Sequence, residues 1–132
     1  SCSWVCAAME ILDSRYKGFK YFSLEDVVAD NSSSSYFVLG KEKIDPKKID
    51  VRNLKMTMNA KEEEFIGNSN AILGDPVNSI MEFCELLELN NLSLKAGSIV
   101  LAGAATTAVN LAAGMHVKLT VEKLGGVFLD IK

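Results

Sequence analysis

The chain has 132 residues, 48% of them hydrophobic and 23% charged, which are ordinary values for one soluble globular domain. The formal net charge of −3 argues against a general binder of nucleic acid or anionic membranes, because such proteins need a basic surface. No run of 18 apolar residues occurs, so no membrane-spanning helix is expected. We therefore treat residues 1–132 as a single domain without a nucleic-acid or membrane partner.

The cysteine content indicates a reducing compartment. Cys2, Cys6 and Cys84 are too few and too scattered for a disulfide framework. Residues 1–9 lack the basic flank and long apolar core of a secretory signal, so we expect a cytoplasmic protein. Cys2 and Cys6 could share a helix face, but zinc would need two more ligands. The only histidine, His116, lies in a predicted strand.

The first expected elements are a helix that leads into a short strand over residues 3–12. This segment is apolar apart from Glu10, and four of its residues follow helical spacing, namely Trp4, Ala7, Ala8 and Ile11. Ser23 is expected to cap a short helix, with Asp26 three residues later. Residues 36–39 are expected to form a strand.

A hairpin and a long helix are expected in the middle of the chain. Residues 51–58 alternate as a strand does, and residues 62–69 are expected to return as its partner. Asp75 followed by Pro76 predicts the start of a helix over 76–89. Its apolar residues recur with helical spacing and are expected to pack on the sheet: Val77, Ile80, Met81, Cys84 and Leu87.

The last third of the chain is expected to hold three more strands, over 98–102, 116–121 and 127–131. A loop of small residues, 103–108, follows the first of them. In the second, Val117, Leu119 and Val121 alternate and are expected to point inward. The elements do not follow a βαβ order, so the predicted fold class is α+β, mostly β, with one long helix.

Seven short motifs occur in a fixed order along these segments: Glu10-Ile-Leu-Asp-Ser-Arg15, Phe19-Lys20, Val28-Ala-Asp-Asn-Ser-Ser33, Phe37-Val-Leu-Gly40, Leu73-Gly-Asp-Pro-Val-Asn78, Leu94-Lys-Ala-Gly97 and Leu124-Gly125. Together they resemble the central motifs of the 2-keto-4-pentenoate hydratase and 4-oxalocrotonate decarboxylase family, within the fumarylacetoacetate hydrolase superfamily. Each motif is weak alone, and it is the ordered set, over nearly the whole chain, that carries the resemblance.

The resemblance implies a mixed β-sheet roll of the fumarylacetoacetate hydrolase C-terminal type around a divalent-metal pocket. It implies Mg²⁺ or Mn²⁺ held by three carboxylates, with a small 2-keto or 2-hydroxy dienoic acid in the open positions. Such acids arise in the catabolism of aromatic rings. The cation acts as a Lewis acid that stabilises negative charge on the dienolate.

Three functions stay open on these motifs. Asp13 precedes Ser-Arg, where hydratases often carry glycine, and loop 103–109 is also nearer the decarboxylase pattern. We therefore favour a 4-oxalocrotonate decarboxylase. The alternative is a 2-keto-4-pentenoate (2-hydroxypenta-2,4-dienoate) hydratase, and a second alternative is a non-catalytic remnant or assembly domain of the same fold.

Glu10 matches one of the metal-binding carboxylates of the family. An ionised glutamate inside an apolar run is costly to bury unless a cation compensates its charge. We expect Glu10 to be buried and to face a pocket bordered by the loop of Ser32 and Ser33 and by Gly103 and Ala104. The alternative is an exposed glutamate at the end of an apolar helix.

The other candidate residues each have a functional and a structural interpretation. The resemblance makes Lys20 and Ser33 candidates for catalysis, and makes Arg15, Ser32, Gly103, Ala104 and Thr106 candidates for substrate binding. For Arg15 we favour a structural role, since an ion pair with Asp30 would order the serine loop. Lys20 is equally explained as a solvated lysine, and 103–108 as a packed turn.

The resemblance covers only the C-terminal half of the longer family members. Two further carboxylates are expected in a Glu-x-Glu motif upstream; Glu62 and Glu64 have that spacing but lie downstream, at a predicted hairpin tip. The chain alone is therefore expected to bind metal weakly and to be inactive. We expect the full-length enzyme to form a homo-oligomer, or a complex with the partner hydratase or decarboxylase.

Overall fold

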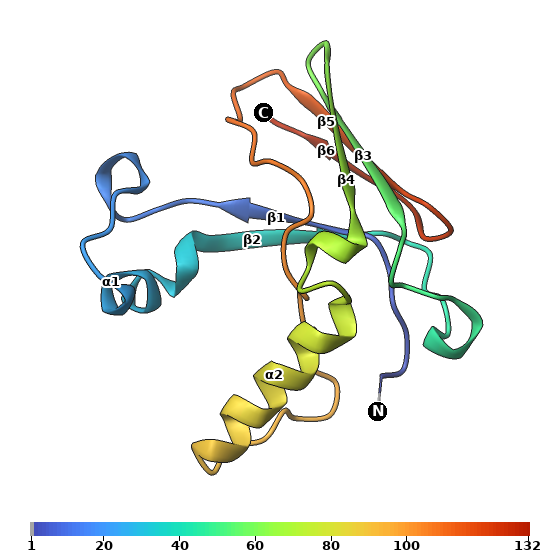
Figure 1. Cartoon of the computed structure of the whole chain (residues 1–132). Coiled ribbons are helices and arrows are strands. Elements are labelled where there is room, and N and C mark those ends of the chain that lie inside the picture. The colour runs from blue at the N-terminus through green and yellow to red at the C-terminus, as the bar shows by residue number, and fades with distance from the viewer. Residues whose placement is uncertain (1) are drawn as a thin grey trace.

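The structure is a computed structural model that describes residues 2–132. Its regular elements are two α-helices and six strands, joined by short 3-10 turns (Figure 1). The strands are β1 (Ala8–Leu12), β2 (Ser34–Leu39), β3 (Lys55–Ala60), β4 (Glu63–Asn68), β5 (His116–Val121) and β6 (Gly125–Asp130), and the helices are α1 (Leu24–Ala29) and α2 (Pro76–Leu89). The prediction of a mostly β protein with one long helix is confirmed.

The larger sheet has four strands in the order β4-β3-β5-β6. The predicted hairpin is confirmed, with Met58 of β3 opposite Phe65 of β4 and, on the other side, opposite Leu119 of β5. Alternate residues of β5 are buried, namely Val117, Leu119 and Val121, as the sequence pattern predicted. This face of the sheet forms the core together with Leu54 and Val127.

The second sheet is a two-stranded ribbon of β1 and β2, in which Glu10 lies opposite Phe37. The helix expected just before β1 does not form. Val5 instead exchanges two backbone hydrogen bonds with Ile44, each 2.9 Å long, which hold this segment extended. All strand pairs among residues 2–132 are antiparallel, so the expectation of a mixed sheet is wrong for this part of the fold.

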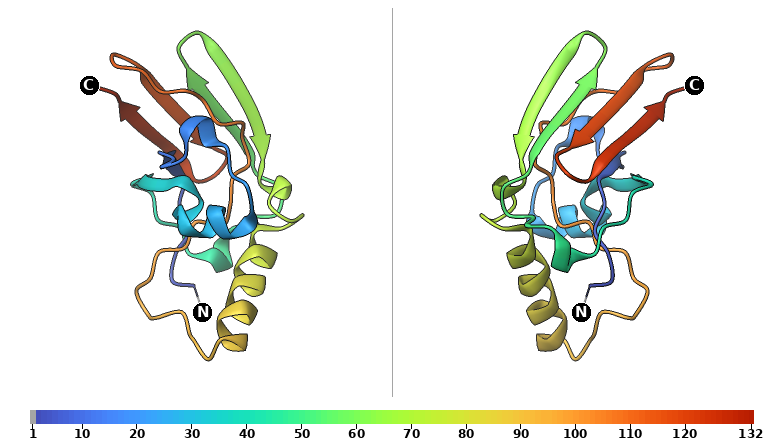
Figure 2. Two further views of the ribbon diagram at one scale, coloured as in Figure 1. Left: turned by 90° about the vertical axis from the view of Figure 1, so that its left-hand side faces the viewer. Right: turned by 90° about the vertical axis from the view of Figure 1, so that its right-hand side faces the viewer.

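Helix α2 has the predicted bounds but not the predicted packing. The Asp75 side chain accepts a hydrogen bond from the Val77 amide at 2.8 Å, and Pro76 occupies the first turn. The helix extends away from the strands, as both views in Figure 2 show, and none of its residues is buried. Met81 is 56% exposed and Cys84 is also exposed, so the expectation that this face packs on the sheet is wrong.

The segment after α2 runs beside the helix without forming a strand. The expected strand over 98–102 is absent because no backbone ladder joins these residues to a neighbour in the described chain. Within residues 2–132, no helix has the length and apolar character needed to cross a lipid bilayer.

Candidate functional site

Glu10 lies on the open face of the β1–β2 ribbon. Successive side chains of a strand point to opposite faces, so Met9 enters the core and Glu10 points the other way. Glu10 is exposed, so the expectation of a buried Glu10 is wrong, although its place in a strand is confirmed. The physical reason is that residues 2–132 provide nothing that covers this face of the short ribbon.

Directly beyond the ribbon, a buried carboxylate joins three segments of chain. Asp30 is 2% exposed, and its Oδ1 atom accepts the Arg15 amide at 3.0 Å and pairs with the Arg15 Nε at 2.5 Å. Its Oδ2 atom accepts hydrogen bonds from three hydroxyls: Ser14 at 2.9 Å, Tyr21 at 2.7 Å and Ser33 at 3.0 Å. The predicted pairing of Arg15 with Asp30 is therefore confirmed.

The environment of Asp30 keeps it ionised. Burial raises the pKa of this carboxyl, but the hydrogen bonds from Tyr21, the Arg15 amide, Ser14 and Ser33 together outweigh burial and hold the pKa well below its usual range. An ionised carboxylate only accepts hydrogen bonds. The Arg15 amide, the Arg15 Nε and the three hydroxyls therefore all act as donors to Asp30.

The serine loop held by Asp30 has an unusual backbone. Three consecutive residues, Asn31, Ser32 and Ser33, have φ angles of 50°, 51° and 61° in the left-handed region. Ser33 is only 3% exposed, whereas Ser32 is open to solvent. The Ser33 carbonyl accepts the Asp13 amide at 2.8 Å, so the loop continues the ribbon three residues beyond Glu10. The structure thus joins the loop to the end of the strand whose middle residue is Glu10.

The loop that begins at Gly103 is placed by contacts with β4 and α2. The Ser79 hydroxyl donates to the Ala102 carbonyl at 2.5 Å. A β-carbon on Gly67 of β4 would lie 2.8 Å from the Ala105 carbonyl carbon and 2.9 Å from Thr106 Cγ2, so only glycine leaves room for the crossing loop. Gly103 and Ala104 are exposed and Thr106 is half-buried.

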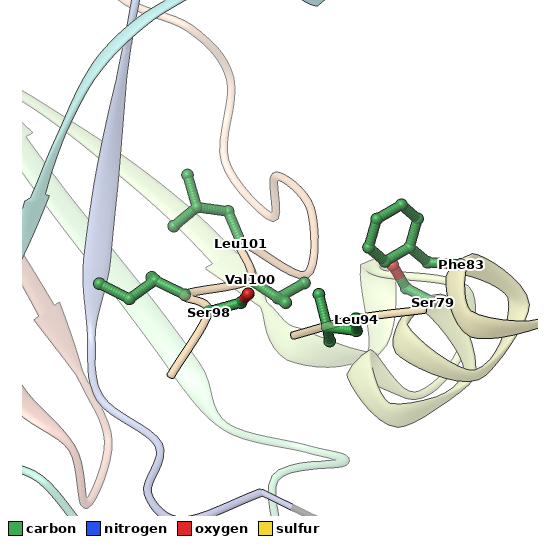
Figure 3. A pocket seen from close by; sticks show the side chains of 7 residues that line it. Ser79, Phe83, Leu94, Ser98, Val100 and Leu101 are labelled. Carbon is green, nitrogen blue, oxygen red and sulfur yellow. The ribbon is translucent and has the colours of Figure 1, made fainter. Parts of the chain in front are cut away.

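Two cavities are formed by other residues. One, of about 460 Å³, lies between α2 and the segment 94–101 and is lined by side chains of both, including Phe83, Leu94 and Leu101 (Figure 3). The other, of about 480 Å³, lies between β2 and β6. No candidate site residue lines either cavity, so neither is the common pocket expected for Glu10, the serine loop and Gly103.

The described residues do not by themselves make a metal centre. Among residues 2–132 there is no group of three histidine, cysteine, aspartate or glutamate side chains placed to hold one ion. Glu10 offers a single exposed carboxylate, whereas Mg²⁺ needs near-octahedral oxygen coordination. Lys20 is also exposed and forms no ion pair with a described residue.

Sequence reasoning missed Ser14 and Tyr21. Ser14 lies inside the motif that contains Arg15, and its position beside that arginine was the available signal. Nothing in the local pattern marks Tyr21, because its contact with Asp30 spans nine residues and depends on the path of α1.

Comparison with known proteins shows which class of enzyme has this architecture. The solved structure of 4-oxalocrotonate decarboxylase from Pseudomonas putida G7, complexed with magnesium and adipate, superposes with a TM-score of 0.92 at 32% identity, over 98% of this chain and 49% of that one. A second structure of that enzyme, complexed with calcium and acetate, gives 0.90 at 30% identity. The fold is thus that of half of a decarboxylase, one kind of lyase.

Curated sequences agree with this class. A 4-oxalocrotonate decarboxylase of Pseudomonas sp. is 46% identical over 93% of this chain and 47% of its own length. A 2-keto-4-pentenoate hydratase of Dechloromonas aromatica is 35% identical over 91% of this chain and 46% of its own. No family model matches the chain. The chain is homologous to the 4-oxalocrotonate decarboxylase and 2-keto-4-pentenoate hydratase family, and it spans about half the length of the curated relatives it matches.

Proposed function

We propose that this chain forms one half of a divalent-metal-dependent lyase that decarboxylates 4-oxalocrotonate. The observation that carries the proposal is the 46% identity to one 4-oxalocrotonate decarboxylase, since two other decarboxylases, at 34%, lie within the 32% to 35% range of the hydratases. Hydration of 2-hydroxypenta-2,4-dienoate is the second candidate, since hydratases match as much of the chain as the decarboxylase does, 91% and 95% against 93%. In either case the substrate is a small 2-keto or 2-hydroxy dienoic acid.

The site would lie on the open face of the β1–β2 ribbon. Glu10 would supply one carboxylate to a Mg²⁺ or Mn²⁺ ion, and the other ligands would come from outside residues 2–132. The chemistry of a bound divalent ion is Lewis-acid stabilisation of negative charge. On this chain, Ser32, Ser33 and the loop of Gly103, Ala104 and Thr106 would bind and orient the substrate, with Arg15 holding the serine loop and Lys20 near the substrate anion.

The remaining features of the proposal concern the whole molecule. We place the 132 residues in a single catalytic-type domain with the superfamily's β-roll, completed by the rest of the enzyme. The exposed apolar face of α2 supports burial in a larger assembly, either a homo-oligomer or a complex with the partner hydratase or decarboxylase. The three free cysteines support a reducing, cytoplasmic location.

The test uses the full-length gene product that contains this chain, or a chimera in which residues 2–132 replace the matching half of the Pseudomonas decarboxylase. Each is given 4-oxalocrotonate and 2-hydroxypenta-2,4-dienoate separately, with Mg²⁺ and with chelator. Carbon dioxide release from the first substrate supports the decarboxylase. Hydration of the second alone transfers the assignment to the hydratase, and activity that survives complete chelation contradicts the metal mechanism.

Glu10→Gln is the sharpest variant for the proposed metal ligand. Glutamine keeps the shape but removes the charge that holds the cation, so lyase activity should fall to near background at ordinary Mg²⁺ and should recover in part at high Mg²⁺. Glu64→Gln, at the exposed hairpin, is the matched control and should leave activity unchanged. Equal Mg²⁺ dependence in the wild type and Glu10→Gln would remove Glu10 from the metal site.

A further inference from the structure

Three hydroxyls converge on one oxygen of Asp30, and two of them, from Ser14 and Tyr21, belong to residues without an assigned role. Tyr21 lies 2.7 Å from Asp30 Oδ2 and also contacts the Ser14 hydroxyl at 3.0 Å and the Ser33 hydroxyl. We propose that Tyr21 is a positioning residue of the lyase site, which with Asp30 locks Ser33 so that the left-handed turn at 31–33 presents Ser32 to the open face of the ribbon. This inference rests on the proposed function.

The donors and acceptors around Asp30 explain why Tyr21 is needed. Each hydroxyl has one proton, and the carboxylate takes the protons of Ser14, Tyr21 and Ser33. The Ser14 oxygen also accepts the Tyr16 amide at 3.0 Å. The Ser33 hydroxyl is thus directed toward Asp30, and the Tyr21 hydroxyl lies against it.

The serine turn needs such a lock because its backbone is costly. Left-handed geometry is disfavoured for residues with a side chain, by about 1–2 kcal/mol each, and three of them follow one another here. Local bonds offset part of that cost, since the Ser33 amide donates to the Asp30 carbonyl at 2.9 Å. The Ser33 hydroxyl bond to the same residue makes the turn depend on the whole Asp30 cluster.

The lock acts on the candidate site through the ribbon. The Ser33 carbonyl accepts the Asp13 amide, and Leu12 lies opposite Ser34, so the turn is bonded to the strand that carries Glu10, although the pairing shifts register between Ile11 and Leu12. A turn that relaxes would move the exposed Ser32 relative to Glu10. A displacement of about 1 Å in a group that orients substrate lowers the rate by about 10²-fold.

A neighbouring tyrosine provides a matched control. The Tyr16 ring packs on Tyr21 with 5.1 Å between centroids, and its hydroxyl donates to Asp26 at 2.9 Å instead of to Asp30. Tyr21→Phe and Tyr16→Phe each remove one hydroxyl from a pair of packed rings, and each removes one hydrogen bond to a carboxylate. We expect Tyr21→Phe to lower kcat/KM of the full-length enzyme or chimera by about 10- to 100-fold, with unchanged Mg²⁺ dependence, and Tyr16→Phe to stay within about twofold.

Hydrogen exchange of the same variants gives a readout independent of activity. Loss of the lock should speed exchange of the amides in 30–34 by about fivefold to tenfold in Tyr21→Phe and leave them unchanged in Tyr16→Phe. Equal activity losses in both variants, in step with their melting temperatures, would overturn the positioning role. If the wild type acts on neither substrate, the proposed function fails, and hydrogen exchange alone then decides whether Tyr21 holds the serine turn. Faster exchange of residues 30–34 confined to Tyr21→Phe supports that role, and equal exchange in both variants refutes it.

Discussion

Gly67→Ala tests whether the crossing between β4 and the loop after Gly103 is as close as the structure shows. The φ angle of Gly67 is not left-handed, so alanine meets no backbone penalty and the variant changes only the space at the crossing. The new methyl would overlap the Ala105 carbonyl oxygen, its nearest neighbour, and would lie 2.8 Å from the Ala105 carbonyl carbon, whereas ordinary contacts begin at 3.4 Å. The loop must therefore retreat by about 0.6 Å or more at that atom, or the strand must bend.

The expected cost of this shift is about 1–3 kcal/mol of unfolding free energy, the range for overpacked sites. Urea titration of the 132-residue chain measures it, with Ile66→Ala as control. Ile66 precedes Gly67 on β4 and is 62% exposed, so its loss should cost below about 1 kcal/mol. In the full-length enzyme or chimera, the displaced loop should also lower kcat/KM by about 10²-fold. A Gly67→Ala chain with the unfolding midpoint of the wild type would refute the crossing.

Two further predictions concern stability. Leu54→Ala should lower the free energy of unfolding by about 2–5 kcal/mol in the same titration, because Leu54 is only 2% exposed. Leu89→Ala is the control, since this residue of α2 is 79% exposed, and should change stability by less than about 0.5 kcal/mol. Equal losses in the two variants would contradict the assignment of Leu54 to the core. The lowered pKa of Asp30, from a usual 3.8, means that its stabilising contribution is complete above that pH and is lost as the pH falls further toward the folded-state pKa. Melting temperatures between pH 7 and pH 2 should therefore decline more steeply below pH 4 in the wild type than in Asp30→Asn, and parallel curves would contradict this assignment.

Local signals determined several elements of this protein. Asp75 and Pro76 specify the start of α2 whatever surrounds it, since a side-chain cap and a preset φ act within one turn. The alternation in β5 predicted its buried face, because the period of a strand is independent of its partners. The Arg15–Asp30 pair was predicted from charge and from the need to order a polar loop.

Tertiary structure decided the rest. Residues before β1 have helical spacing, but Val5 pairs with Ile44, and such long-range backbone bonds override a weak local preference. The helical spacing of the apolar residues in α2 predicted the helix, yet periodicity does not say what covers an apolar face, and none of the helix residues is buried within residues 2–132. Glu10 is exposed for a related reason, since the ribbon is open on its side. Tyr21 reaches Asp30 only because α1 folds the chain back, a juxtaposition that depends on the path of the backbone rather than on any sequence spacing.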